Sequence, residues 1–149
     1  MQKVQDYLEN YQDLWWEISQ KGAYLPCMDV TMDMVDEDDY YGCDFTGKRQ
    51  VMELFFTGSS DYFPGFFIGK DNYEDNLDQY PIYVFDLPSD EPVEFIGNFK
   101  TYMTKLIEGY LENHKRGKFV KMAQTALMEL DQFSDKMIHK EEYVLKINN

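Results

Sequence analysis

Cysteine and histidine are scarce in this chain of 149 residues, which contains only two of each. Cys27 and Cys43 are not in a CxxC spacing, and a chain of this length needs no disulfide, so we expect a reducing compartment. A zinc site needs four nitrogen or sulfur ligands, and the spacing of these four residues resembles no common zinc motif. His114 and His139 lie in polar stretches, and we expect both to be exposed rather than catalytic.

Motifs for phosphate, calcium and membranes are also missing. The chain contains neither GxxxxGK[ST] nor GxGxxG, which excludes the usual phosphate-binding loops. Residues 71–78, DNYEDNLD, are acidic but lack the glycine and the alternating ligands of an EF-hand, although weak calcium binding there stays open. No apolar run approaches the roughly 18 residues of a membrane span. Residues 1–16 carry charges without an apolar segment, so we expect no signal peptide. The expectation is a cytoplasmic protein without a catalytic site, cofactor or metal.

Basic residues are few, because 14 Lys and Arg stand against 28 Asp and Glu, which gives a net charge of −14. The imbalance lies in the first 113 residues, which hold seven basic and 23 acidic residues. Repulsion from phosphates argues against nucleic acid as a partner. A basic protein would instead be attracted over a long range. The alternative is that the acidity only keeps the protein soluble.

The acids are most concentrated in residues 34–45, with the sequence MVDEDDYYGCDF. Four consecutive acids would steer a basic partner, and the two tyrosines would add contact area, because interface hot spots favour tyrosine. Consecutive carboxylates repel one another and point in different directions, so we favour a surface over a metal site. In the alternative interpretation, the tyrosines pack over the sheet and the acids are solvated. The residues that we expect to contact a partner are Asp36, Glu37, Asp38, Asp39, Tyr40 and Tyr41.

Hydrophobic periodicity predicts both helices and strands. Apolar residues at steps of three and four predict one amphipathic helix over residues 2–20, with Trp16 beside the apolar stripe. Asn98 is placed to cap a helix that ends at residue 113, and Gly117 to turn the chain into a second helix over 119–133. Aromatic and β-branched runs predict antiparallel strands. The predicted strands are 50–56, 63–69, 81–87 and 93–97, with 28–32 and 141–147 as further candidates.

The predicted fold is therefore α+β. We expect an antiparallel sheet of about four to six strands, packed against an N-terminal helix and two C-terminal helices. Neither an internal repeat nor a long linker is visible, so residues 1–149 are expected to form a single domain.

Three segments over about residues 60–111 carry a family resemblance. Their order resembles the SUKH superfamily, the group of fungal cell-wall-synthesis regulators and bacterial immunity proteins. In that family a strand ending in Ile-Gly precedes a strand with a partner-facing segment, and a helix opened by phenylalanine follows. The chain departs from the pattern at residues 70–78, which replace a glycine-rich turn. The matching positions are Ile68-Gly69, Pro81-Ile82-Tyr83, and Asn98-Phe99 with Tyr102-Met103.

The resemblance implies binding rather than catalysis, because bacterial members of the family look like cytosolic antidotes that sit on a toxin. Many such toxins are nucleases, whose basic surfaces an inhibitor can occupy with carboxylates. We therefore expect a non-catalytic, acidic protein-binding module, a monomer or weak homo-oligomer, with a basic partner such as a toxin domain. The alternatives are a small hydrolytic or metal-dependent enzyme with an acidic site, and a regulatory or structural subunit.

Overall fold

The computed structural model describes residues 2–21, 32–34, 50–54, 62–69, 75–86 and 91–138. These residues form helices and an antiparallel sheet, so the predicted α+β class is confirmed. The helices are α1 (Gln2–Asn10), α2 (Gln12–Gln20), α4 (Phe99–Asn113) and α5 (Lys118–Glu129), with short 3₁₀ turns η1 (Leu77–Gln79) and η2 (Leu130–Gln132). The strands are β1 (Met32–Met34), β2 (Gln50–Leu54), β3 (Tyr62–Gly69), β4 (Ile82–Asp86) and β5 (Glu91–Gly97).

The strands pair in the order β1-β2-β3-β4-β5, and every pairing is antiparallel. Each strand therefore lies beside the next one along the chain, as short connections favour. Of the two further strand candidates, residues 141–147 and 28–31 lie outside the described residues, and Met32, the last residue of 28–32, begins β1. In the register, Phe66 lies opposite Ile82, and Tyr83 lies opposite Gly65 on one side and Phe95 on the other.

The alternation along β4 divides the sheet into two faces, as its sequence predicts. Ile82 and its cross-strand partner Phe66 are fully buried in the core that the sheet shares with the helices. Tyr83 and Phe85 lie outside that core, with their ring centroids 6.2 Å apart. Successive side chains of a strand point to opposite faces, so this pair belongs to the face turned away from the helices.

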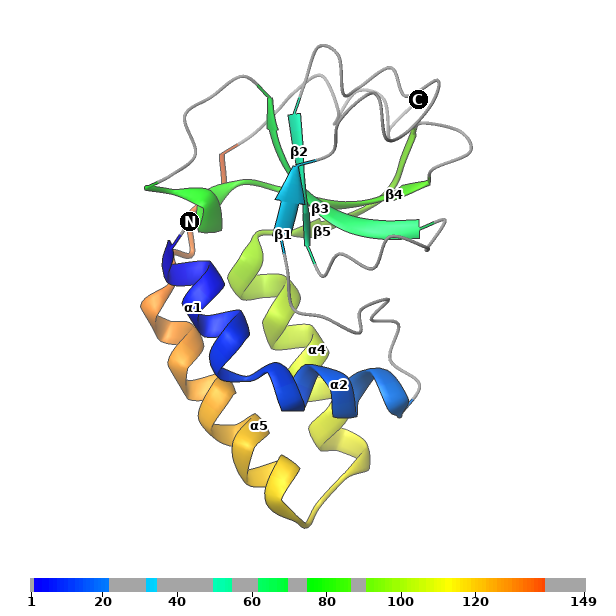
Figure 1. The fold of residues 1–149 in the computed structure, drawn as a ribbon, viewed down its shortest axis with the longest axis vertical. Helices are drawn as coiled ribbons and strands as arrows, with labels where there is room; N and C mark the ends of the chain where they lie inside the picture. Colours follow the sequence, from blue (N-terminus) through cyan, green and yellow to red (C-terminus); the bar gives the residue numbers. More distant parts are fainter. Residues whose placement is uncertain are drawn as a thin grey trace.

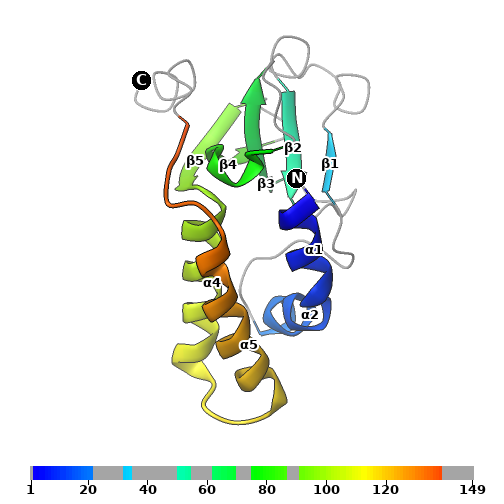
Figure 2. The same cartoon turned by 90° about the vertical axis from the view of Figure 1, so that its left-hand side faces the viewer.

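The helices gather on one side of the sheet, and α4 and α5 extend away from it as a hairpin (Figure 1). Figure 2 shows α1 and α2 beside this hairpin. Aromatic rings fill the junction: the ring of Phe99 at the start of α4 lies 4.9 Å from that of Phe133 and 5.9 Å from that of Tyr7. The apolar stripes of all four helices and the inner face of the sheet thus share one core.

Residues 2–10 and 12–20 form two helices, so the prediction of one continuous helix over 2–20 was wrong. The helix is interrupted at Tyr11, whose φ of −117° and ψ of 27° are not helical. Tyr7 donates a hydrogen bond to the Ala126 carbonyl and Tyr11 donates one to the Glu129 carboxylate, so α5 holds the chain on the N-terminal side of the break and at the break itself. Neither proline nor glycine marks this position in the sequence, and the kink follows from packing against α5 rather than from a local signal.

The start of α4 agrees closely with the prediction. Gly97 has a φ of +111°, which favours glycine, and a Cβ there would lie 3.0 Å from Cγ2 of Thr101. Asn98 follows as the N-cap, and its Oδ1 accepts a 3.0 Å hydrogen bond from the Thr101 amide. Gly117, with a φ of +110°, is the N-cap of α5 and turns the chain into it as expected, but α5 ends at Glu129 and η2 follows, short of the predicted end at residue 133.

Candidate functional site

The predicted contact residues 36–41 lie outside the described residues, as do His139 and both cysteines. That interpretation of the acidic run stays a prediction. The candidate surfaces below are therefore built from the helices and the described strands.

The two adjacent tryptophans of α2 have opposite environments. Trp15 is fully buried, its Nε1 donates a 2.8 Å hydrogen bond to the Leu8 carbonyl, and its ring lies 5.8 Å from that of Tyr7. Trp16 lies one residue further around the helix and is 41% exposed. Exposed tryptophan is unusual in a folded chain with a large core, because the indole ring gains so much from burial. Trp16 is therefore the first candidate for a contact residue.

The surroundings of Trp16 are acidic and polar. Residues at helical spacing from it are exposed on the same face of α2, and we call this face the Trp16 surface: Gln12, Asp13, Trp16 and Gln20. Exposed Asp6 and Glu9 on α1 add negative charge, and residues 4–20 contain no lysine or arginine. A basic partner would thus find an aromatic contact within a negative field.

A second aromatic lies on the sheet. Phe95 of β5 is 45% exposed, and its ring centroid lies 5.3 Å from that of Tyr83. Tyr83 itself, in the segment that the family resemblance places toward a partner, is only 1% exposed. Phe95 is the exposed aromatic on this face of the sheet, whereas the exposed Glu94 before it points to the opposite face, as successive residues of a strand do.

Two hollows flank α4 and share Lys105 and Leu106. The α2–α4 hollow has a volume of about 340 Å³ and is lined by Ile18, Lys21, Lys105, Leu106, Gly109, Tyr110, Asn113 and His114. The sheet–α4 hollow has about 320 Å³ and is lined by Pro64, Val84, Glu94, Ile96, Tyr102, Lys105 and Leu106. Their residues from α4 form one stripe along that helix, because they are spaced by three and four positions.

The expectation that His114 is exposed was wrong. Its ring stacks on Tyr110 with centroids 4.2 Å apart, and its Nδ1 lies 3.0 Å from the Tyr110 carbonyl, which it can only meet as a donor. The hydroxyl of Tyr110 donates a 2.9 Å hydrogen bond to Glu17. Burial, followed by this hydrogen bond, raises the pKa of Tyr110 to about 12. His114 thus closes the end of α4, and Tyr110 remains a neutral donor at physiological pH.

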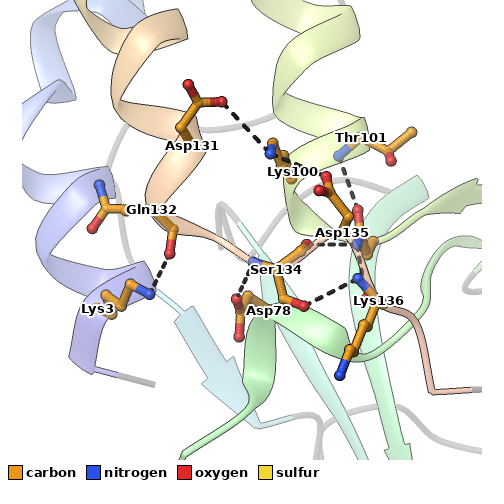
Figure 3. Close-up of polar contacts among 10 residues, drawn as sticks. Lys3, Asp78, Lys100, Thr101, Asp131, Gln132, Ser134, Asp135 and Lys136 are labelled. Carbon is orange, nitrogen blue, oxygen red and sulfur yellow. Dashed lines mark hydrogen bonds and ion pairs between the residues drawn. The ribbon is translucent and has the colours of Figure 1, made fainter.

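A polar clamp, formed by Asn98, Asp78, Ser134 and Lys136, fixes the segment after η2. Figure 3 shows Asp78, Ser134 and Lys136 of this clamp. Asn98 is 3% exposed, and its Nδ2 donates to the carbonyls of Ser134 and Lys136, at 3.0 Å each. Asp78 accepts a 2.8 Å bond from the Ser134 amide, and the Ser134 hydroxyl accepts one from the Lys136 amide. Every polar atom of the Asn98 carboxamide is therefore used, and the clamp ties the start of α4 to both η1 and the segment after η2.

Exposed ion pairs at the edge of the clamp are weaker than its buried hydrogen bonds. Lys100 lies 3.0 Å from Asp135 and 3.6 Å from Asp131, and both carboxylates are strongly exposed. Lys3 donates to the Gln132 carbonyl. Exposed pairs contribute little in water, so the buried hydrogen bonds of Asn98 dominate the clamp. We assign it a structural role that positions α4.

Within the described residues, no three His, Cys, Asp or Glu side chains lie close enough together to hold a metal ion. Within the same residues, no helix combines the length and apolar character needed to cross a membrane. Searches against protein-family models, curated proteins and solved structures found no match to this chain.

Only part of these surfaces could be predicted from local sequence patterns. The helical periodicity placed Trp16 at the edge of the apolar stripe, but an edge position alone does not predict exposure. Tyr102, Leu106 and Tyr110 of the α4 stripe are apolar or aromatic, so their spacing alone predicts a core position rather than the lining of a hollow. The available signal was Gly109, since glycine inside a helix is unfavourable and usually has a packing or functional reason.

Proposed function

We propose that this chain is a non-catalytic, acidic protein-binding module whose partner is a basic protein. The Trp16 surface carries the proposal. Tryptophan, with tyrosine and arginine, is the residue type most enriched among interface hot spots. Here a tryptophan that is 41% exposed lies on a helical face without a cation, next to a tryptophan that is fully buried. The core gains nothing from leaving such a ring in water, whereas a partner could cover it.

The charge supports the same class of partner. The net charge of −14 would speed association with a basic protein and would oppose binding to nucleic acid. Residues 36–39 would add to this field whatever their conformation, because long-range steering depends on charge more than on contact.

The more specific proposal is an immunity protein of the SUKH type in the cytoplasm, which neutralises a basic toxin such as a nuclease. The resemblance supports it: its segments fall at the end of β3, on β4 and at the start of α4. At the last of these, Asn98 serves as both helix cap and clamp. The acidic surface would occupy the toxin surface that otherwise holds phosphates.

Affinity purification from native lysate tests the proposal. Four tagged proteins are compared: the wild type, Trp16→Ala, a variant with residues 36–39 changed to Asn or Gln, and Met128→Ala. Met128 is the matched control, because it is 75% exposed and apolar but lies on α5. We expect a basic protein to co-purify with the wild type and with Met128→Ala, and to be reduced with the other two.

The salt dependence of co-purification distinguishes a partner that is attracted by charge from a protein that is captured non-specifically. A true partner should be released progressively between about 50 and 500 mM salt, because exposed charge pairs are screened over that range. If all four proteins retain identical companions, or if each is recovered alone, the binding proposal is wrong.

A further inference from the structure

The α2–α4 hollow has the size and composition of a small-ligand site. Its volume of about 340 Å³ lies in the usual range for such sites. Buried Ile18 and half-buried Leu106 supply apolar surface, while Lys21 and Lys105 supply two ammonium groups. An apolar wall with a few convergent polar groups is the usual composition of a ligand pocket.

The fold accounts for some of the basic side chains near this hollow but not for all of them. Lys115 donates to the Leu111 carbonyl and His114 to the Tyr110 carbonyl, so both complement the end of α4. Lys21 follows the end of α2, where the helix dipole favours a cation. Lys105 lies in the middle of α4, where the dipole favours neither sign, and its ammonium forms no ion pair or hydrogen bond with another described residue.

Gly109 is the second feature that packing leaves unexplained. It lies inside α4, a helix of 15 residues, where glycine is destabilising relative to alanine. A Cβ built at Gly109 would meet no atom within 4 Å, so no neighbour requires the absence of a side chain. Its φ is not in the left-handed region, unlike those of Gly97 and Gly117. Gly109 lines the hollow, so the absence of a side chain at this position leaves space in the hollow.

We infer that the α2–α4 hollow binds a small molecule with an anionic head group, a carboxylate or a phosphate, attached to an apolar body. Lys105 and Lys21 would pair with the head group, and the apolar body would lie against Ile18 and Leu106. Among the described residues, the Glu17 carboxylate accepts a hydrogen bond from the Tyr110 hydroxyl, and Glu94 lines the neighbouring sheet–α4 hollow together with Lys105. The site is separate from Trp16, which does not line the hollow, so it stands independently of the proposed protein partner.

Amide chemical shifts of the full-length protein test the inference with three probes: phenyl phosphate, benzoate and uncharged benzyl alcohol. We expect one of the two anions to give saturable shifts at Lys21, Gly109 and His114, and the one that binds more tightly identifies the head group. Lys105→Ala should weaken binding about tenfold, because a charge-assisted pair is lost. Lys121→Ala is the matched control, since this exposed lysine lies on α5 and does not line the hollow.

A second variant tests whether binding can be lost without loss of the folded structure. Gly109→Leu should fill the hollow and abolish binding while the amide spectrum outside α4 remains that of the folded protein. Equal binding of benzyl alcohol would overturn the anionic assignment. Unchanged affinity in Lys105→Ala, or shifts that follow all exposed lysines without saturation, would show that the lysines are ordinary solvated surface and that the hollow is not a site.

Discussion

At the residue scale, Trp15 and Trp16 have the same side chain and differ only by 100° of rotation around α2. Trp15 continues the stripe of Tyr7, Tyr11 and Leu14, so its ring is buried and its Nε1 is satisfied by the Leu8 carbonyl. Trp16 falls outside the stripe and is left in contact with water. The helical period predicts this difference, but it cannot tell whether another segment covers the outer ring.

We expect alanine substitutions of the two tryptophans to have very different effects on the free energy of unfolding. Trp15→Ala should lower the free energy of unfolding by about 3–5 kcal/mol, since it removes a large buried ring. Trp16→Ala should change it by less than about 0.5 kcal/mol, as is usual for exposed positions. Urea unfolding followed by circular dichroism measures both values. A large loss of stability in Trp16→Ala would mean that this ring belongs to the core and would weaken its assignment as a contact residue.

Asn98 should be the most sensitive polar position among the described residues. Asn98→Ala removes the cap of α4 and leaves the carbonyls of Ser134 and Lys136 without donors, which together should cost about 3 kcal/mol. Asn98→Asp keeps the cap acceptor but places a carboxylate against those two carbonyls, so it should also be destabilising.

Asn113→Ala, at the exposed end of the same helix, is the matched control for Asn98 and should cost less than about 0.5 kcal/mol in urea unfolding. If Asn98→Asp were as stable as the wild type, the two bonds donated by Nδ2 would contribute nothing, and the clamp would have no energetic role.

At the scale of elements, the sequence predicts what depends on local periodicity and capping. Asn98 and Gly117 mark the starts of the two C-terminal helices, and alternation places β4 with its two faces. The break at Tyr11 could not be predicted, because the apolar stripe continues through it and its cause is a contact with α5, more than 100 residues away in sequence. Tertiary packing of this kind overrides helical propensity, and the local sequence carries no signal of it.

Two glycines of the α4–α5 hairpin should respond in opposite ways to alanine. Gly109→Ala should raise the free energy of unfolding by about 0.5–1 kcal/mol. Alanine has a higher helix propensity than glycine, and the added methyl group meets no atom. Gly117→Ala also meets no atom, but its φ of +110° is strained for alanine, so it should cost about 1–3 kcal/mol. Chemical denaturation compares the two. A destabilised Gly109→Ala would show that α4 needs glycine for its own structure.

At the scale of the whole molecule, charge and surface were only partly predictable. Net charge follows from composition, and without any structure it favours a basic partner over a nucleic acid. Residues 36–41 were singled out for their composition, yet composition cannot place them relative to Trp16. The exposure of Trp16 and Phe95 depends on which segments cover which faces, and this information is not local.

Alkaline pH should destabilise the protein through its buried tyrosines. Burial raises the pKa of Tyr7, Tyr11 and Tyr83, and raises that of Tyr110 to about 12 together with its hydrogen bond to Glu17. The folded state therefore keeps protons that the unfolded state, with an ordinary tyrosine pKa near 10, releases. The stability from this source is complete below about pH 10 and is lost as the pH rises toward 12.

Urea midpoints measured between pH 9 and pH 11.5 should fall with pH, and the fall should be shallower in Tyr110→Phe. This variant begins from a lower stability because it also loses the bond to Glu17. Equal slopes in the two proteins would mean that Tyr110 ionises as easily in the folded state as in the unfolded one.

The most direct test of the central claim is the affinity for the basic protein that the wild type retains, measured by calorimetry over a range of salt concentrations. We expect Trp16→Ala to weaken binding by at least about tenfold, which corresponds to 1.4 kcal/mol. Met128→Ala should leave the affinity unchanged, and the affinity of the wild type should fall steadily as salt increases. Wild-type affinity in Trp16→Ala, or affinity independent of salt, would contradict an acidic binding surface centred on Trp16.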